Sequence, residues 1–262
     1  MTMKNPAFVL ITGASYGLGE EYALQLAQRG KRLLLTARSQ ARLESLRPGL
    51  LAAGAPEVRL VTADLAADGV EVLTRYIAAE QLEIELLINN AGFGGGGEFA
   101  RCDAARQLAM IDVNVRALVA LSRALLPAMR ERQSGAIMNL GSVASFQPGP
   151  YGATYAATKA FVLSFSLALW QEYREYGVHI MAVCPGYTDT HFFEAANLAP
   201  PRGVYMQSAA QVVTESLRAL DRRKPYVVTG APNRWLVRAS RVSPRLWVVK
   251  VTAKWMRTRW QR

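Results

Sequence analysis

The amino-acid sequence predicts an α/β fold, a doubly wound parallel sheet of seven strands with helices on both faces. Three observations support this prediction. Short apolar runs alternate with longer amphipathic stretches, the first run leads into a glycine-rich turn, and 51% of the 262 residues are hydrophobic, which is enough for a sizeable core. A chain of this length usually forms one domain of this class.

Short apolar runs of this kind are typical of buried strands. The runs are Phe8 to Thr12, Arg32 to Thr36, Val58 to Ala63, Glu85 to Asn89, Ala136 to Leu140, Val178 to Val183 and Tyr226 to Thr229. The segments between them are long enough for helices, and repeated strand-helix units with right-handed crossovers cover both faces of a parallel sheet. Ligands of such folds bind beyond the carboxyl ends of the strands, so the residues directly after each run are candidates for a site.

The positive charge of the chain is concentrated near its C-terminus. The net charge is +11, but the chain has 12 Lys or Arg and no Asp or Glu from Arg222 onward, which leaves 19 basic and 20 acidic residues before it. A nucleic-acid-binding domain would draw basic residues from its core sequence as well. We therefore expect no nucleic-acid partner, and we assign any electrostatic partner to the C-terminal tail.

The cysteine usage indicates a reducing compartment. Neither Cys102 nor Cys184 lies in a CxxC motif or at metal-ligand spacing from a histidine, so we expect no disulfide, no metal site and a cytoplasmic location. The apolar run Ala7 to Ile11 is too short for the core of a signal peptide, and no later run is long enough to span a membrane. His179 and His191 have no partner in the sequence, so we interpret both as structural.

The glycine-rich turn after the first strand is a candidate phosphate site. It reads Thr12-Gly13-Ala14-Ser15-Tyr16-Gly17-Leu18-Gly19 and leads into the helical stretch Glu20 to Gln28. Its glycines permit a tight turn and let backbone N–H groups approach a pyrophosphate at the helix N-terminus. An ordinary tight turn is the alternative, but the position between a first strand and a first helix favours dinucleotide binding.

The end of the second strand indicates which dinucleotide binds. Thr36-Ala37-Arg38 offers no carboxylate to the ribose hydroxyls of NAD(H), whereas the planar cation of Arg38 suits a 2′-phosphate. Ser15 could add a hydrogen bond to that phosphate, while Tyr16 stands where a second basic residue would strengthen the case. The sequence favours NADP(H), with NAD(H) as the alternative cofactor and a solvated Arg38 as the alternative interpretation.

Tyr155 and Lys159 are the candidate catalytic pair. They open a long helical stretch and, four residues apart, project from one face. A free phenol has a pKa near ~10, and a nearby ammonium with an oxidised nicotinamide lowers it toward the range useful for proton transfer. Ser142 follows the fifth strand, and Asn114 lies in mid-helix, where propensity disfavours an amide. A random Tyr and Lys at this spacing would in most cases be a packing residue and a surface charge.

Taken together, these features resemble the classical short-chain dehydrogenase/reductase family over about residues 6 to 230. The matches follow in order: the glycine motif, Asp64-Leu65 after the third strand, Asn89-Asn90-Ala91-Gly92 after the fourth, Asn114, Ser142, Tyr155 with Lys159, Pro185-Gly186 and Thr190. The resemblance implies a Rossmann-type sheet, NAD(P) chemistry without a metal, and a catalytic set of Asn114, Ser142, Tyr155 and Lys159.

The resemblance also implies a role for each residue. Lys159 would hold the ribose and lower the Tyr155 pKa, Ser142 would stabilise the developing oxyanion, and Asn114 would position a water that relays protons. The residues expected at the cofactor, besides Tyr155 and Lys159, are Gly13, Ser15, Tyr16, Gly17, Leu18, Gly19, Arg38, Asp64, Leu65, Asn90, Ala91, Gly92, Pro185, Gly186, Thr188 and Thr190. Among these, Asp64 and Leu65 would flank the adenine, Asn90 would support the floor of the site, and Thr188 or Thr190 would approach the carboxamide and pyrophosphate.

The segment near residues 187–207 takes the place of the family's substrate lid. Its apolar residues, and two more at the same mouth, are Tyr187, Phe192, Phe193, Leu198 and Tyr205, with Phe93 and Phe146. They favour a lipophilic carbonyl or alcohol substrate, although aromatic residues are also ordinary lid packing. We expect the enzyme to be a homodimer or homotetramer.

Residues 231–262 are expected to be a basic amphipathic extension of a catalytic domain that spans residues 1–230. In its first helix, Arg234, Arg238 and Arg241 share one face and Trp235, Leu236 and Val242 the other. Ser243-Pro244 predicts the N-cap and first residue of a second helix, where Lys250, Lys254 and Arg257 repeat the basic spacing and Val248, Val251 and Trp255 form an apolar stripe.

Two interpretations of this extension remain open. Basic amphipathic helices with Trp suit an anionic membrane interface, here the inner face of a membrane. Packing on its own subunit or a neighbour, with a solvated basic face, is an equal alternative. For the whole chain the leading hypothesis is an NADP(H)-dependent carbonyl reductase or alcohol dehydrogenase, and the rival is a nucleotide-sensing or scaffold protein without turnover.

Overall fold

The computed structural model describes residues 7–190, 192 and 203–260, and within them the side chains of all but 258–260. Its central sheet has the strand order β3-β2-β1-β4-β5-β6-β9, and all neighbouring strands are parallel. The strands are β1 (Ala7–Thr12), β2 (Arg32–Ala37), β3 (Val58–Thr62), β4 (Glu83–Asn89), β5 (Gly135–Leu140), β6 (Val178–Cys184) and β9 (Tyr226–Val228). The predicted seven-stranded parallel sheet is confirmed.

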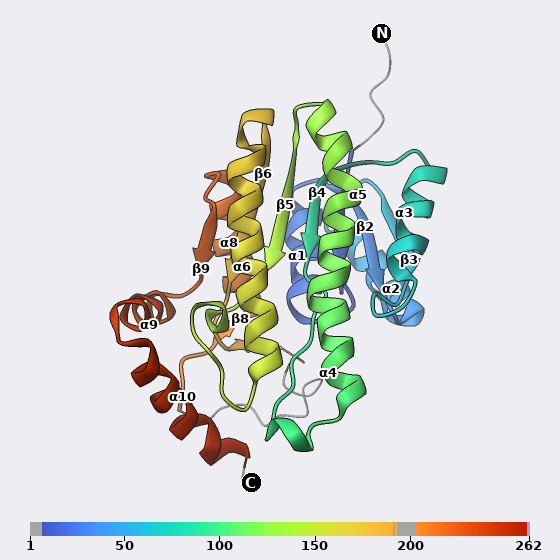
Figure 1. Ribbon diagram of the computed structural model, residues 1–262. Coiled ribbons are helices and arrows are strands. Elements are labelled where there is room, and N and C mark those ends of the chain that lie inside the picture. Colours follow the sequence, from blue (N-terminus) through green and yellow to red (C-terminus); the bar gives the residue numbers. More distant parts are fainter. Residues whose placement is uncertain (1–6, 191, 193–202, 261–262) are drawn as a thin grey trace.

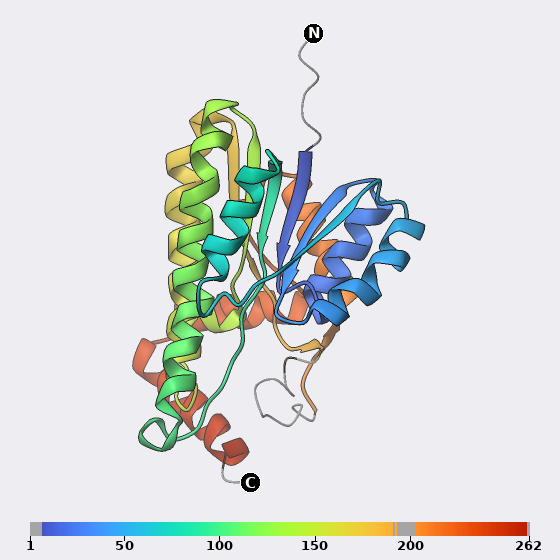
Figure 2. The ribbon, with the colours of Figure 1, turned by 90° about the vertical axis from the view of Figure 1, so that its right-hand side faces the viewer.

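Helices cover both faces of the sheet (Figures 1 and 2). One layer consists of α1 (Gly17–Gln28), α2 (Gln40–Ala52) and α8 (Ala209–Asp221), and the other of α3 (Gly69–Ala79), α5 (Leu118–Glu131) and α6 (Ala153–Tyr173). Because successive side chains of a strand point to opposite faces, Val9 and Ile11 enter one core cluster while Phe8 and Leu10 enter the other. The strands are therefore apolar over most of their length, as parallel strands buried on both faces are.

Shorter elements lie at the ends of these layers. They are α4 (Ala104–Ile111), the π-helical turn η2 (Asp112–Ala117), the 3-10 turns η1 (Phe99–Arg101), η3 (Val143–Phe146) and η4 (Arg174–Tyr176), and the strands β7 (Thr188–Asp189) and β8 (Gln207–Ser208). The last two pair in parallel as a small second sheet that the sequence analysis did not predict. Two residues are too few to give a strand a recognisable alternation.

Two helices follow the sheet, α9 (Ala231–Val242) and α10 (Arg245–Trp260), and both lie beyond the carboxyl ends of the strands (Figure 1). The predicted cap is wrong by one residue. The Ser243 hydroxyl donates to the Ala239 carbonyl and so closes α9, while the Pro244 carbonyl accepts from Val248 N–H, which makes Pro244 the N-cap of α10. The cap moves by one residue because the connection between the two helices is short and the Ser243 side chain already caps the end of α9. The domain boundary near residue 230 stays a prediction.

The helices of the described chain were also compared with the requirements of a membrane span. None of them combines the length and the apolar character needed to cross a bilayer.

Candidate active site

The turn between β1 and α1 is shaped for a close approach of the backbone. Gly13 and Gly17 have φ values of 63° and 59°, a region that side chains disfavour. A Cβ on Gly19 would lie 2.2 Å from the Gly13 carbonyl oxygen. The Asn90 side-chain amide donates to the carbonyls of Thr12 (2.9 Å) and Gly13 (3.0 Å), so β4 holds this turn in place.

A single large cavity of about 1340 Å³ lies at the carboxyl ends of the strands. The cavity is lined by most of the residues that were expected at the cofactor: Gly13, Ser15, Tyr16, Gly17, Leu18, Arg38, Asp64, Leu65, Asn90, Ala91, Gly92, Pro185, Gly186, Thr188 and Thr190. Ser142, Tyr155 and Lys159 line it as well. Two expected residues do not: Gly19 packs against Gly13, and Asn114 lies behind Gly92.

The end of β2 presents the cation that was considered for a 2′-phosphate. Arg38 is exposed at the cavity and forms no ion pair with another described residue. Arg42 on α2 was not singled out in the sequence. Its guanidinium lies 4.5 Å from the centre of the Tyr16 ring and donates to the Ser15 carbonyl (3.3 Å) and to Glu20 (3.2 Å). Arg42 thus braces the glycine turn beside Arg38. This role could not be predicted from the sequence, because it depends on how α2 packs against the turn.

Tyr155 and Lys159 lie on the first turns of α6, as their spacing predicts. The Lys159 ammonium donates to the Leu140 carbonyl at 2.7 Å and lies 5.9 Å from the centre of the Tyr155 ring. Burial lowers the pKa of Lys159 to about 8. Lys159 is therefore held at the junction of β5 and α6, close to the phenol without contacting its oxygen.

The phenol of Tyr155 is uncharged at neutral pH. Burial raises its pKa to about 12, although a hydrogen bond with the Ser142 side chain acts in the opposite direction. The lowered pKa that was expected from Lys159 is not seen in this state, because desolvation outweighs the other influences. The protonated phenol of Tyr155 thus lies next to Ser142.

A capping arrangement fixes Ser142 at the start of η3. The Ser142 hydroxyl accepts from Ala144 N–H at 3.1 Å, and the Ser142 N–H donates to the Ser145 hydroxyl at 3.1 Å. Ser145 in turn donates to the Lys159 carbonyl at 2.7 Å. Ser145 therefore ties the Ser142 turn to the helix of Tyr155 and Lys159. This positioning residue was not predicted from the sequence, although its place three residues after Ser142 is that of a capping box.

Asn114 lies in the π-helical turn η2, and its side chain is buried. Its carbonyl oxygen accepts from Phe93 N–H (3.1 Å), and its amide donates to the Phe93 carbonyl (3.0 Å) and to the Thr158 hydroxyl (3.1 Å). Asn114 therefore clamps the loop after β4 to α6. The proton relay that was expected of Asn114 stays a prediction, while the clamp gives it a positioning role.

A buried row of polar side chains lies below the site. The Asn89 amide donates to Asn139 (2.9 Å) and Ser122 (3.3 Å), and the Asn139 amide donates to Ser166 (3.0 Å). This row links α5, β4, β5 and α6. Buried polar groups that are satisfied in this way hold one arrangement of the elements that carry Ser142 and Tyr155. Only the strand pairing brings these four residues together.

The described part of the lid closes over Tyr155. The Phe192 ring lies 5.7 Å from the Tyr155 ring, and Thr190 lies against Gly17. Thr188 is buried in β7, next to Gly186. Phe193, Leu198 and His191 lie outside the described residues.

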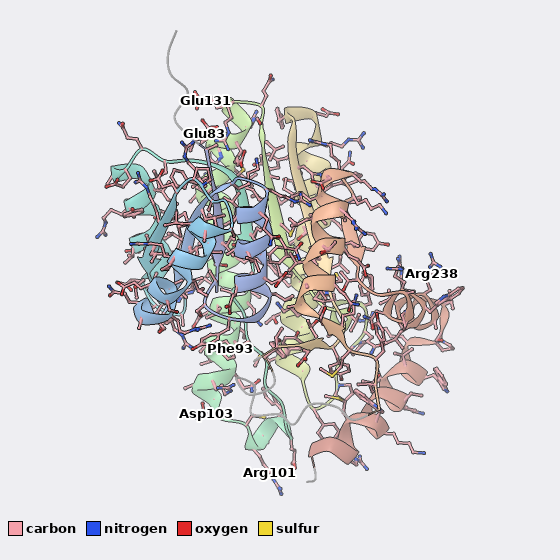
Figure 3. All side chains as sticks on the ribbon, turned by 180° about the vertical axis from the view of Figure 1, so that it is seen from behind. Glu83, Phe93, Arg101, Asp103, Glu131 and Arg238 are labelled. Atoms are coloured by element: carbon pink, nitrogen blue, oxygen red, sulfur yellow. The ribbon has the colours of Figure 1, made fainter. Side chains whose placement is uncertain are left out.

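The remaining residues with a predicted role can also be placed. His179 is buried in β6, where burial lowers its pKa to about 4, in agreement with a structural residue. Cys102 and Cys184 are both free thiols. Phe93 lies at the carboxyl end of the sheet and Glu83 at the opposite end (Figure 3).

The C-terminal helices form the outer wall of the cavity. Their lining residues are Pro232, Asn233, Leu236, Ala239, Ser240, Ser243, Trp247, Val248, Val251, Thr252, Trp255 and Met256. The Trp255 ring lies 6.1 Å from that of Tyr187 on the lid. The predicted apolar stripe of Val248, Val251 and Trp255 therefore faces the enzyme's own cavity, because the cavity wall offers it an apolar partner.

The grouping of α9 residues by face is also corrected. The buried face of α9 carries Asn233 and Val237, whereas Trp235 and Val242 are exposed. The expected separation of Trp235 from the arginines fails, because Arg238 lies 5.4 Å from the centre of the Trp235 ring. The side chains of Asn233 and Val237 anchor the helix, and the large Trp235 ring lies on the exposed side.

The residues around the cavity fit a dinucleotide. The glycine turn leaves room for a pyrophosphate at the N-terminus of α1, and Arg38 provides a cation that no described carboxylate neutralises. Asp64 and Leu65 line the cavity beyond β3. With Tyr155, Ser142 and Lys159 at the other end, the cavity can hold a cofactor and a substrate in contact.

Known proteins match both the sequence and the fold. The family model for short chain dehydrogenases matches residues 7–200. The NADP-dependent 3-hydroxy acid dehydrogenase of Escherichia coli is 37% identical over 182 residues, which cover 68% of this chain and 71% of that protein. The short-chain dehydrogenase from Sphingobium yanoikuyae, solved in complex with NADPH, has a TM-score of 0.82 at 34% identity and covers 87% of this chain and 91% of its own.

A further relative differs in length. The very-long-chain 3-oxoacyl-CoA reductase of Anas platyrhynchos is 33% identical over 189 residues, which cover 70% of this chain. The match covers 60% of that protein, so this chain spans less than two thirds of its length.

Proposed function

Because the chain belongs to the short-chain dehydrogenase/reductase family, and is an oxidoreductase of CH–OH and C=O groups with NAD(P), we propose that it is an NADP(H)-dependent carbonyl reductase or alcohol dehydrogenase acting on a lipophilic substrate. The observation that carries the proposal is the placement of Ser142, Tyr155 and Lys159 in a large cavity whose outer wall, formed by α9 and α10, carries mostly apolar side chains. Such walls favour apolar ligands.

In the proposed reaction the chain's own residues manage the proton and the developing charge. The Tyr155 hydroxyl donates its proton to the carbonyl oxygen during reduction and recovers it from the alcohol during oxidation. Ser142, which hydrogen-bonds Tyr155, stabilises the negative charge on the same oxygen. Lys159 holds the ribose and favours the phenolate once the proton has left. The nicotinamide, when bound, supplies or accepts the hydride.

The proposed preference for NADP(H) rests on Arg38 and its neighbour Arg42. Arg38 can pair with the 2′-phosphate, while Arg42 stacks on Tyr16 and keeps the turn close to it. A relative solved with NADPH supports this preference, and NAD(H) stays the alternative cofactor.

Assembly and location belong to the same proposal. Leu108 and Ile111 on α4 and Phe161 on α6 are 63%, 43% and 40% exposed, which supports a homodimer or homotetramer. The free thiols Cys102 and Cys184 support a cytoplasmic location. The basic residues of α9 and α10 support peripheral attachment to the inner face of an anionic membrane. Light scattering of the purified protein tests the assembly.

The activity is tested by a screen of ketones, aldehydes and secondary alcohols of increasing apolar size, each with NADP(H) and NAD(H). Turnover should be highest with a large apolar compound and NADP(H). A nucleotide-sensing or scaffold role is not favoured, because a protein that only binds has no need of the Ser142, Tyr155 and Lys159 set. Cofactor binding with no turnover of any compound would support that role instead.

A further inference from the structure

Exposed apolar and basic side chains gather where α9 meets α10, and we call this surface the α9–α10 corner. Its members are Trp235, Val242 and Leu246, which are apolar, and Arg238, Arg241 and Arg245. Trp235, Val242 and Leu246 are 68%, 86% and 76% exposed. Single exposed apolar residues are ordinary, whereas three large ones interleaved with cations on adjoining turns form a patch that needs a partner.

The helix geometry places these residues on one outer surface. Trp235 and Val242 are seven residues apart, which is two turns, so both lie on the side of α9 opposite Asn233 and Val237. Arg238 covers the Trp235 ring and projects from the outer side of α9 (Figure 3). Leu246 continues the surface on the first turn of α10.

The corner's positive charge is uncompensated within the described chain. No Asp or Glu follows Asp221 in the sequence. Among the described residues, α9 and α10 form one ion pair, between Arg234 and Glu215. The unneutralised charge therefore favours an anionic partner for Arg238, Arg241 and Arg245.

The corner adjoins the mouth of the active-site cavity. Leu236 and Trp247 line the cavity and are also 53% and 58% exposed. Val251 and Trp255 continue the apolar wall inward along α10, toward Tyr187 of the lid. An apolar path thus leads from the corner to the lid that closes over Tyr155.

We propose that the α9–α10 corner docks on an anionic lipid bilayer, and that a lipophilic substrate enters the cavity from that bilayer between Leu236 and Trp247. The docking assigns a surface to the peripheral attachment proposed above, and the entry route rests in addition on the proposed activity. A soluble acidic partner would neutralise the cations but leave Trp235, Val242 and Leu246 in water. A bilayer accepts the apolar residues at its headgroup boundary and the cations at its anionic surface.

Two triple variants test the docking without touching the cavity. The apolar variant carries Trp235→Ser, Val242→Ser and Leu246→Ser, and the charge variant carries Arg238→Gln, Arg241→Gln and Arg245→Gln; none of these six residues lines the cavity. The matched control carries Arg47→Gln and Leu51→Ser on the exposed side of α2, at the opposite edge of the molecule (Figure 1).

The measurement is co-sedimentation of the full chain with vesicles. One set contains phosphatidylcholine alone, and the other contains phosphatidylcholine and phosphatidylglycerol in equal parts, each at low and high salt. The parent and the control should bind the anionic vesicles at low salt and largely dissociate at high salt. Both triple variants should bind at least roughly tenfold more weakly, because each removes one of the two contributions.

Clear results would overturn the docking. The corner would be excluded as a membrane surface if the parent protein did not bind anionic vesicles. It would also be excluded if the triple variants bound them as the control does. A triple variant that loses self-association in light scattering instead would identify a second copy as the occupant. Unchanged melting temperature and unchanged turnover of a small water-soluble ketone show that the variants are folded.

The entry route has its own readout. For a ketone dissolved in anionic vesicles, kcat/KM of both triple variants should fall at least roughly tenfold, while the water-soluble ketone is turned over normally. Loss of vesicle binding without loss of turnover of the vesicle-borne ketone would refute entry from the bilayer. An enzyme that turns over neither ketone would refute the proposed function and leave the binding test valid.

Discussion

Tyr155 illustrates how the surroundings of a side chain control its proton. Burial raises the pKa of its phenol to about 12, so the hydroxyl stays protonated at neutral pH. The Lys159 ammonium is held 5.9 Å from the ring centre by its hydrogen bond to the Leu140 carbonyl. Burial also lowers the pKa of Lys159. The proton that the proposed reduction transfers is therefore held on the Tyr155 hydroxyl at neutral pH.

The first prediction concerns this hydroxyl. Tyr155→Phe should lower kcat by about a hundredfold to ten-thousandfold, because it removes the proton donor and retains the ring that contacts Phe192. The affinity for NADPH, measured by fluorescence titration, should stay within about threefold because Arg38 and the glycine turn are untouched. Turnover close to that of the parent would disprove the assigned acid.

Arg38 carries the second prediction. Arg38→Asp should weaken NADPH binding by about ten- to a hundredfold and strengthen NADH binding, because a charge-assisted hydrogen bond is lost and a carboxylate is placed beside the ribose. Titration of both cofactors measures the change. Arg47→Asp, an exposed change on the neighbouring helix α2, is the matched control and should alter neither affinity. Equal affinities of the parent for both cofactors would show that Arg38 is only a solvated charge.

At the scale of the elements, η2 shows why one helical turn departs from the α conformation. Asn114 lies in the middle of the run Asp112–Ala117, between α4 and α5, and its side chain bonds both backbone groups of Phe93. π-Helical turns inside α-helices are frequent at functional sites. Here the turn orients the Asn114 amide toward the loop that follows β4. Gly92, in that loop, lies against Asn114 and lines the cavity.

The third prediction follows from that clamp. Asn114→Ala should lower the free energy of unfolding by about 2 to 4 kcal/mol, because Phe93 N–H and C=O lose their buried partner. The turnover of the folded variant should also fall as the loop beside Gly92 loosens. Denaturant unfolding and kcat report the two effects.

Thr158→Val is the control for the clamp, because it leaves both bonds between Asn114 and Phe93 and removes only the Thr158 hydroxyl, which accepts from Asn114 and donates to the Tyr155 carbonyl. It should cost about 1 kcal/mol. An equal loss of unfolding free energy in the two variants would mean that the hydrogen bonds between Asn114 and Phe93 contribute nothing to stability.

The sequence predicted elements whose signal is local. The seven strands could be recognised because each buried parallel strand is a continuous apolar run, and the Tyr155 and Lys159 pair because a helix brings residues four apart together. Ser145, Arg42 and the row of Asn89 and Asn139 could not be assigned in this way, since their partners are distant in the sequence and meet only in the folded chain.

The C-terminal extension shows a second limit, at the scale of the whole molecule. Its periodicity predicted two basic amphipathic helices correctly, but an apolar stripe does not specify its partner. The stripe of α10 covers the cavity, and the exposed apolar residues are those at the α9–α10 corner. The extension therefore completes the enzyme on its inner side and is free to bind on its outer side.

The last prediction tests that inner role. Trp255 lines the cavity and lies 6.1 Å from the Tyr187 ring, so Trp255→Ala removes the contact between α10 and the lid. Loss of this apolar surface should raise KM for a large apolar ketone by about tenfold, which corresponds to about 1.4 kcal/mol of binding energy. KM for a small ketone and the affinity for NADPH should not change, because we expect the small ketone at Tyr155 and the cofactor along the glycine turn.

Trp235→Ala is the matched control for Trp255→Ala. Its ring is 68% exposed on the outer face of α9 and does not line the cavity, so KM for the large ketone in solution should remain at the parent value. Loss of activity toward both ketones in Trp255→Ala would indicate that α10 supports the fold of the site rather than selecting its substrate. A tenfold effect confined to the large ketone would assign the inner face of the extension to substrate selection, while its outer cations and Trp235 remain available to a membrane.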